Sequence, residues 1–344
     1  MTDVVTDLNT DMAETAAGYR ALRQGTALVD YTGAGLLNVS GSGAAEFLGR
    51  TSTRSVDFLL EGQVSSALML AGNGTIIAEV VIYCLGAEYL VEIWPQQAAT
   101  GRAHLLAAAG QNADVKVEDL SAAYVILGIE GPESFRIAEH FLSFPIASMA
   151  FRSFAVPDSS TDLALARIGV TGEYGYKFIV PAADAPKRRQ DLKERGALPV
   201  GRNALNVCRM ETRFANIEAE GGNASVTPFD IGVQWMVDFQ HEFNGREALL
   251  ELWRGAPEKS PVCWHAEDGP HTVPAHGAVL TLDGTAVGVV SHAEFSPSLG
   301  RVIGTAQVNT SVASPGLRLD IDGTTVHTIS APFLVATSFG IPLE

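Results

Sequence analysis

From about Cys263 to the C-terminus, the sequence consists of short apolar segments separated by turn-forming residues. Two of the separators are Asp283-Gly284 and Asp322-Gly323, and such pairs favour β-hairpin turns because both positions can adopt a positive φ. Short segments interrupted in this way form antiparallel strands that close into a small barrel or pack as a sandwich. The pattern predicts an all-β domain, with strands at residues 278–282, 286–291, 302–308, 317–321 and 325–329.

The preceding part of the chain alternates predicted strands with predicted helices. Its turns are mostly of the hairpin type, and the one at residues 71–74 carries the glycines that a tight connection between strands needs. This combination favours an α+β architecture with antiparallel sheets over a doubly wound parallel sheet. Because residues 254–261 are polar and contain proline, we place a boundary there, between a region 1–254 and a C-terminal domain 262–344.

Charge and apolar pattern exclude several classes of partner. The formal net charge of −16 argues against nucleic acid, whose phosphates require a basic surface. No apolar run reaches the length of a membrane-spanning helix, and the N-terminal residues do not resemble a signal peptide. An odd number of cysteines without a C-x-x-C pair is typical of free thiols in a reducing compartment. We therefore expect a cytoplasmic protein; its cysteines are Cys84, Cys208 and Cys263.

Residues 167–176 place three glycines around one acidic residue, Glu173. Glycines allow positive φ and a close approach of the backbone to a ligand, so we interpret the segment as a strand, a tight turn and a second strand. A carboxylate held at such a turn can accept hydrogen bonds from a heterocycle that is rich in N–H donors. The alternative is an ordinary hairpin in which Glu173 is solvated.

The same segment resembles the R-T-G-Y-T-G-E-D-G motif of the glycine-cleavage T-protein (aminomethyltransferase) family of folate enzymes, from which Ile168, Val170 and Tyr174 depart. The resemblance implies a three-lobed, folate-binding α+β fold, in which two interleaved domains with antiparallel sheets occupy residues 1–254 and a β-barrel follows. It also implies tetrahydrofolate as the cofactor. Further segments resemble family motifs in the same order, at residues 73–83, 127–132, 208–211, 227–235, 243–249 and 290–299.

The resemblance also implies roles for two carboxylates. Glu173 corresponds to a glutamate that binds the pterin ring. Glu79 stands where the family has the second aspartate of a D-D pair, beside the reactive nitrogens of the folate, and Ala78 replaces the first. Such a carboxylate can move a proton or stabilise a positive charge, so Glu79 is the predicted catalytic residue. The alternative for Glu79 is a solvent-facing position on an alternating strand.

Four more residues are predicted to contact the folate. Arg167 begins the glycine motif and Arg209 is the arginine of the family's L-R-L-E, so either could bind a carboxylate of folate or of a substrate; the alternative for each is a structural ion pair. Tyr83 ends the Glu79 strand and is either a pocket wall or a core aromatic. Trp94 replaces a family asparagine. No metal is expected, because the histidines at 265, 271 and 276 match no zinc spacing.

The function predicted from the resemblance is a tetrahydrofolate-dependent one-carbon transferase, which moves a methyl group from a small O-, N- or S-methylated donor to the folate. Two alternatives stay open. One is an aminomethyltransferase of the glycine-cleavage type, which takes its group from a lipoyl arm on a partner protein. The other is a non-catalytic folate-binding protein that assists iron–sulfur assembly, although the cysteine motif of those relatives is missing from residues 212–223.

Overall fold

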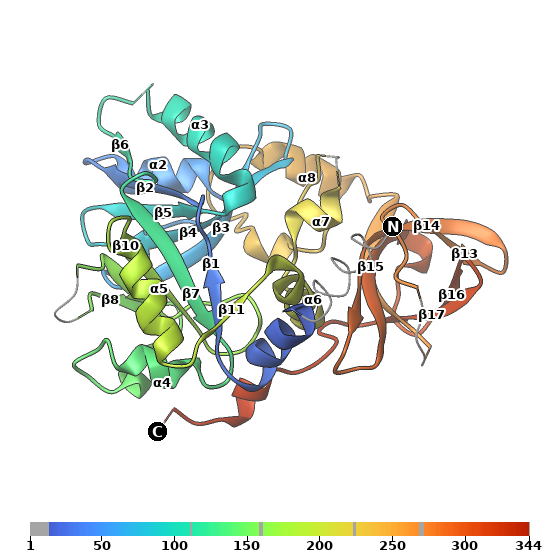
Figure 1. The fold of residues 1–344 in the computed structure, drawn as a ribbon. Helices are drawn as coiled ribbons and strands as arrows, with labels where there is room; N and C mark the ends of the chain where they lie inside the picture. Colours follow the sequence, from blue (N-terminus) through green and yellow to red (C-terminus); the bar gives the residue numbers. More distant parts are fainter. Residues whose placement is uncertain (1–13, 111, 158–160, 223–224, 268–271, 344) are drawn as a thin grey trace, which may run out of the picture.

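The chain folds into two facing β-sheets and a β-barrel (Figure 1). The computed structural model describes residues 14–110, 112–157, 161–222, 225–267 and 272–343. The predicted α+β class with antiparallel sheets and a C-terminal barrel is confirmed. One neighbouring pair of strands, β1 and β11, is parallel.

The first sheet has six strands in the order β11-β1-β7-β10-β9-β8. Helices α4 (Ser134–Glu139) and α5 (Ala185–Glu194) pack on its outer face, where apolar side chains of β7 and β10 meet Leu192 of α5. The strands are β1 (Ala27–Asp30), β7 (Tyr124–Glu130), β8 (Phe154–Ala155), β9 (Ala164–Ala166), β10 (Gly175–Pro181) and β11 (Leu198–Val200).

The second sheet has five antiparallel strands in the order β3-β4-β5-β2-β6. Helices α2 (Ala44–Thr51) and α3 (Ala98–Ala109) cover its outer face. A Cβ at Gly101 of α3 would come within 3.0 Å of Ile93 and Met69, so glycine allows the helix to lie close to the sheet. The strands are β2 (Gly35–Ser40), β3 (Val64–Leu70), β4 (Ile76–Cys84), β5 (Tyr89–Ile93) and β6 (Lys116–Asp119).

The inner faces of the two sheets share one apolar core. Alternate residues of β4 and β5, among them Val81 and Leu90, face Ile126 of β7 and Ile179 of β10. The sheets interleave along the chain, because β2 to β6 lie between β1 and β7 in sequence. A polar side chain that points inward from either sheet is therefore largely shielded from water.

The barrel is closed by six strands in the order β12-β15-β14-β13-β16-β17. Its two tight turns are those predicted: Asp283 and Asp322 have φ of 50°, and the glycine after each also has a positive φ. All five predicted strands are confirmed. The strands are β12 (Lys259–Ala266), β13 (Val279–Leu282), β14 (Thr285–Ser296), β15 (Arg301–Asn309), β16 (Arg318–Ile321) and β17 (Thr324–Ile329).

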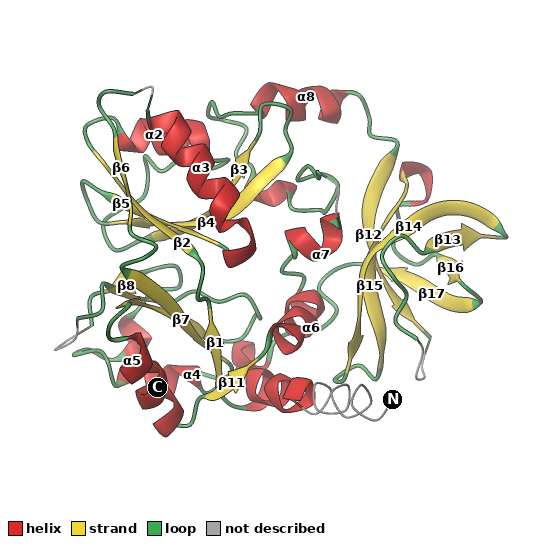
Figure 2. Cartoon of the chain, turned by 45° about the horizontal axis from the view of Figure 1, so that its top comes forward, coloured by secondary structure: helices red, strands yellow, loops and turns green. Residues whose placement is uncertain are grey.

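Figure 2 shows helices α6 (Arg202–Thr212) and α7 (Ile217–Gly221) between the sheets and the barrel. Both helices contact β14, and α8 (Arg246–Arg254) precedes the barrel. Residues 14–24 form a helix beside α6, and the segment after β17 returns to the first sheet. None of the described helices combines the length and the apolar character needed to cross a bilayer.

Candidate functional site

A narrow pocket opens between the two sheets, with about 40 Å³ of free space. Leu68 of β3 and Val81 of β4 line it from the five-stranded sheet, and Lys177 of β10 lines it from the six-stranded sheet. Loop residues complete the wall, notably Trp94 just after β5 and Phe214 just after α6. The walls are mostly apolar, so the few charged groups inside determine what the pocket can bind.

Glu79 extends into this pocket from β4, on the same face as Val81. Its side chain is 16% exposed, and its nearest cationic atom is Arg209 Nη2, which lies 3.6 Å from Oε2. Burial raises the pKa of the Glu79 carboxyl, while Arg209 and Lys177 act in the opposite direction. Arg209 is the ion-pair partner of this carboxylate, and the nearby Trp94 indole N–H also lowers its pKa.

Arg209 and Trp94 lie beside Glu79. The guanidinium of Arg209 stacks 4.4 Å from the Trp94 ring centroid and donates to the carbonyl of Ala215. Arg209 Nε and Trp94 Nε1 are both buried, and neither has a hydrogen-bond partner among the described residues. Two N–H donors and the Glu79 carboxylate thus converge at one end of the pocket, where a ligand with matching polar atoms could bind them.

A second charged pair, Lys177 and Glu92, was missed by the sequence analysis. Lys177 Nζ lies 2.5 Å from Glu92 Oε1, and the two side chains are 1% and 2% exposed. Lys177 Nζ also lies 4.6 Å from the ring centroid of Tyr31, which allows a cation–π interaction. A signal was available, because each residue is a charge inside a strand that is otherwise apolar.

Tyr83 is a core residue rather than part of the pocket wall. Its side chain is fully buried, and its hydroxyl donates to Glu92 Oε2 over 2.6 Å. Burial and the neighbouring Glu92 raise the pKa of the Tyr83 phenol well above its usual range. Tyr83 therefore supports the pocket indirectly, by fixing the carboxylate that pairs with Lys177.

Glu173 and Arg167 line a separate, larger hollow, with about 600 Å³ of free space. Both oxygens of Glu173 are engaged. Oε1 accepts from Arg23 Nη1 at 3.0 Å and from the Thr337 amide at 3.1 Å, and Oε2 accepts from the amide and the hydroxyl of Ser338 at 2.8 and 2.6 Å. The structure therefore separates these two predicted residues from Glu79, Arg209 and Trp94.

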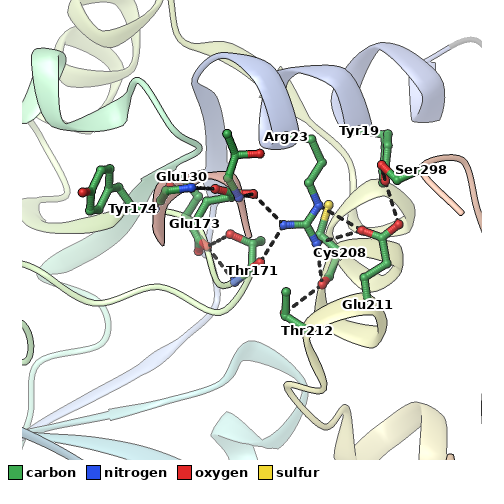
Figure 3. Close-up of polar contacts among 12 residues, drawn as sticks. Tyr19, Arg23, Glu130, Thr171, Glu173, Tyr174, Cys208, Glu211, Thr212 and Ser298 are labelled. Atoms are coloured by element: carbon green, nitrogen blue, oxygen red, sulfur yellow. Dashed lines mark hydrogen bonds and ion pairs between the residues drawn. The ribbon is translucent and has the colours of Figure 1, made fainter. Parts of the chain in front are cut away.

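Arg23 is the centre of a buried network that includes Glu173 (Figure 3). Its guanidinium also donates to Glu211 Oε2 at 2.9 Å and to the Cys208 carbonyl at 3.0 Å. Glu211 Oε1 accepts from Ser296 Oγ of the barrel at 2.5 Å, and from the hydroxyl of Tyr19 at 2.6 Å. Burial and Glu211 raise the pKa of Tyr19 to about 12. The network joins the N-terminal helix, α6, the barrel and the C-terminal segment.

The glycine segment is a loop, not the predicted tight turn, since β9 ends at Ala166 and β10 begins at Gly175. The buried carboxylate of Glu130 holds this loop. Its Oε2 accepts from the amides of Val170 and Thr171 at 3.0 and 3.1 Å. A Cβ at Gly169 would lie 2.9 Å from that same oxygen, so glycine is required for the approach.

In the described part of the chain, no group of three or more His, Cys, Asp or Glu residues is arranged to hold a metal ion. His271 lies outside the described residues.

The sequence matches the family described as "GCVT N-terminal domain" over residues 9–241, and "Glycine cleavage T-protein C-terminal barrel domain" over residues 259–333. It is 28% identical over 295 residues to an aminomethyltransferase of Rubrobacter xylanophilus, covering 85% of this chain and 78% of the relative. It is 30% identical over 308 residues to one of Streptomyces avermitilis, covering 86% and 82%. The fold superposes on the glycine cleavage system aminomethyltransferase T of Bartonella henselae with a TM-score of 0.83, at 22% identity over 94% of this chain and 90% of that one.

Proposed function

Since the chain belongs to the glycine-cleavage T-protein family, we propose that it is a tetrahydrofolate-dependent one-carbon transferase whose reaction takes place in the pocket at Glu79. The observation that carries this proposal is the Glu79 carboxylate, which is held in a mostly apolar pocket beside Arg209 and Trp94. We further propose that the transferred group is a methyl group, taken from a small O-, N- or S-methylated donor.

The residue types of the pocket wall match the pterin ring of tetrahydrofolate, and the narrow space would have to widen to admit it. A reduced pterin is a nearly flat ring with several N–H donors, so it needs an acceptor and apolar walls. Glu79 supplies the acceptor, while Trp94, Leu68 and Val81 supply the walls. The Nε atoms of Arg209 and Trp94 are donors that could meet ring nitrogen or carbonyl groups.

When bound, tetrahydrofolate supplies the nucleophilic nitrogen. That nitrogen would take the methyl carbon as its bond to the donor heteroatom breaks, and the proton that the nitrogen loses would balance the one that the departing heteroatom gains. Glu79 would hold that proton in transit, and its raised pKa brings it closer to the range in which a carboxyl both accepts and releases a proton. Exclusion of water by the apolar walls would strengthen the interaction of Glu79 with a developing positive charge.

The buried Lys177–Glu92 pair would keep the charge around Glu79 balanced. Burial raises the pKa of Glu79 most and Arg209 opposes it, while Lys177 lowers the pKa and Glu92 raises it, so the two charges of the pair act against each other. Binding roles for Glu173 and Arg167 stay predictions, and the hollow that they line is the place where a part of the folate outside the Glu79 pocket would reach them.

A second candidate function is aminomethyl transfer, because the relatives from Rubrobacter xylanophilus and Streptomyces avermitilis are both named aminomethyltransferase. Such a reaction passes a methylene unit to the folate and releases ammonia, so its product differs in mass from the product of methyl transfer. The same pocket would serve either reaction, but the donor would be carried by a lipoyl group on a partner protein.

The test measures binding first and product second. Calorimetry under anaerobic conditions should show that the protein binds tetrahydrofolate, and absence of binding would refute the proposal. Mass spectrometry of the folate after incubation with methylated donors, or with an aminomethyl-lipoyl protein, then separates 5-methyl from methylene product. Binding without turnover of either kind would favour the non-catalytic folate-binding role.

A further inference from the structure

Two arginines near the mouth of the Glu79 pocket have no acidic partner. Among the described residues, neither Arg54 nor Arg152 forms an ion pair, and the Nε atom of each is buried without a hydrogen-bond partner. Arg54 Nη2 donates to the carbonyl of Trp235 at 2.7 Å, and Arg152 stacks 5.6 Å from the Phe151 ring centroid. In a chain with a net charge of −16, two guanidiniums without a carboxylate need an explanation.

Their position connects them to the pocket. Arg152 and Trp235 both line the pocket. Arg54 does not line it, but its guanidinium is hydrogen-bonded to the Trp235 carbonyl in the pocket wall. Phe151, directly before Arg152, lines the larger outer hollow, and the two spaces share Gly169 and Phe214 in their linings. Arg152 therefore lies where the pocket meets the outer hollow.

The backbone conformation of Arg152 and its position near Arg54 are both unfavourable in the protein without a ligand. Arg152 has a φ of 59°, a conformation that residues other than glycine rarely adopt. Hydrogen bonds from the Arg152 amide to the Arg167 carbonyl, and from the Val64 amide to the Arg152 carbonyl, hold it there. Burial and the charge of Arg54 lower the pKa of Arg152. An anion bound between the two guanidiniums would satisfy the unpartnered donors and offset the repulsion.

We propose that Arg54 and Arg152 bind a carboxylate of a ligand that occupies the Glu79 pocket. The inference rests on the proposed function, in which tetrahydrofolate carries the carboxylates of its glutamyl tail. Arginine recognises carboxylates through paired N–H donors, and two arginines can hold one carboxylate or the two of a glutamyl group. The carboxylate has two possible sources: the glutamyl tail of tetrahydrofolate, or an acid group on the one-carbon donor.

The experiment titrates the protein with three probes in a calorimeter: tetrahydrofolate, 6-methyltetrahydropterin, which lacks the tail, and benzoate as a simple carboxylate. Wild type is compared with Arg152→Met and Arg54→Met, which lie on different loops, so that one variant still tests the site if the other fails to fold. Arg318→Met, on the exposed surface of the barrel, is the matched control and should bind all three probes as wild type does.

If the tail is the source, Arg152→Met and Arg54→Met lose about tenfold or more in affinity for tetrahydrofolate and nothing for 6-methyltetrahydropterin. If the donor is the source, both folate probes bind unchanged, and benzoate binds folate-loaded wild type but not the variants. Unchanged binding of all three probes in both variants would overturn the inference. Failure of wild type to bind either folate probe would instead refute the proposed function, and the benzoate titration of the free protein would still decide whether the arginines bind a carboxylate.

Discussion

Lys177 Nζ lies 2.5 Å from Glu92 Oε1, and this buried ion pair joins the six-stranded sheet to the five-stranded sheet. Lys177 belongs to β10 and Glu92 to β5, so the pair bridges the shared core at the floor of the pocket. A buried pair of this kind adds little net stability over apolar residues, but either partner alone is a buried, uncompensated charge. The two positions therefore depend on each other.

We expect Lys177→Met to lower the free energy of unfolding by about 3–5 kcal/mol, because Glu92 then stays buried without its cation. The double variant Lys177→Met/Glu92→Gln should regain a large part of this loss, since Gln can still accept from Tyr83. Urea denaturation of wild type, both single variants and the double variant gives the coupling energy. Additive effects of the two single changes would show that the charges do not depend on each other.

Glu79→Gln should retain tetrahydrofolate binding within a few-fold and lose about 100-fold or more in turnover, because Gln cannot hold the transferred proton. Glu79→Asp, which keeps the carboxylate on a shorter side chain, is the matched control and should retain more activity than Gln. Turnover of wild type should also fall as the pH is lowered through the raised pKa of Glu79. Full activity of Glu79→Gln would remove this residue from the mechanism.

The raised pKa of Glu79 also predicts a dependence of stability on pH. A carboxyl whose pKa is higher in the folded than in the unfolded state binds its proton more tightly when folded. Its contribution to stability is therefore fully present below the unfolded pKa and is lost as the pH rises through the folded pKa. Glu79→Gln should accordingly melt at a higher temperature than wild type at pH 7, and the difference should shrink as the pH falls. Thermal melts at several pH values, with the exposed Glu247→Gln as control, check this.

Glu173→Gln should loosen the C-terminal segment, because Gln has a single acceptor oxygen and no charge to offer Arg23, Thr337 and Ser338. Hydrogen exchange at the Thr337 and Ser338 amides should become faster, while amides inside the barrel strands keep their rates. Unchanged exchange at these two amides would show that the hydrogen bonds do not hold the segment. Calorimetry on the same variant measures whether Glu173 also contributes to folate affinity.

The barrel could be predicted from the sequence because its signals are local. Each hairpin is encoded by a turn such as Asp283-Gly284 between two short apolar segments, so strand bounds and antiparallel pairing follow from neighbouring residues. The same holds for the alternation of strands and helices before it. The parallel pairing of β1 with β11 was not predicted, since it joins segments far apart in the sequence and no turn encodes it.

The site could be predicted only in part, for the same reason. Glu79, Arg209 and Trp94 do meet, although they come from β4, α6 and the end of β5. The pairing of Lys177 with Glu92 depends on how the two sheets face each other, and no local sequence pattern predicts that arrangement. Likewise, the motif around Glu173 shows where a carboxylate stands but not that Arg23 and the C-terminal segment occupy its oxygens.

The return of the chain after β17 has a mechanical consequence. The barrel packs on α6 and α7 through β14, and its chain is tied to the rest of the molecule at both ends. One tie is the linker that follows α8, and the other is Phe333 and Leu334, whose amides donate to the Glu211 carbonyl before Ser338 reaches Glu173. A body held at two separate points cannot swing about either of them as a hinge. We therefore expect ligand entry and exit to involve side chains and loops at the pocket mouth and not a swing of the barrel.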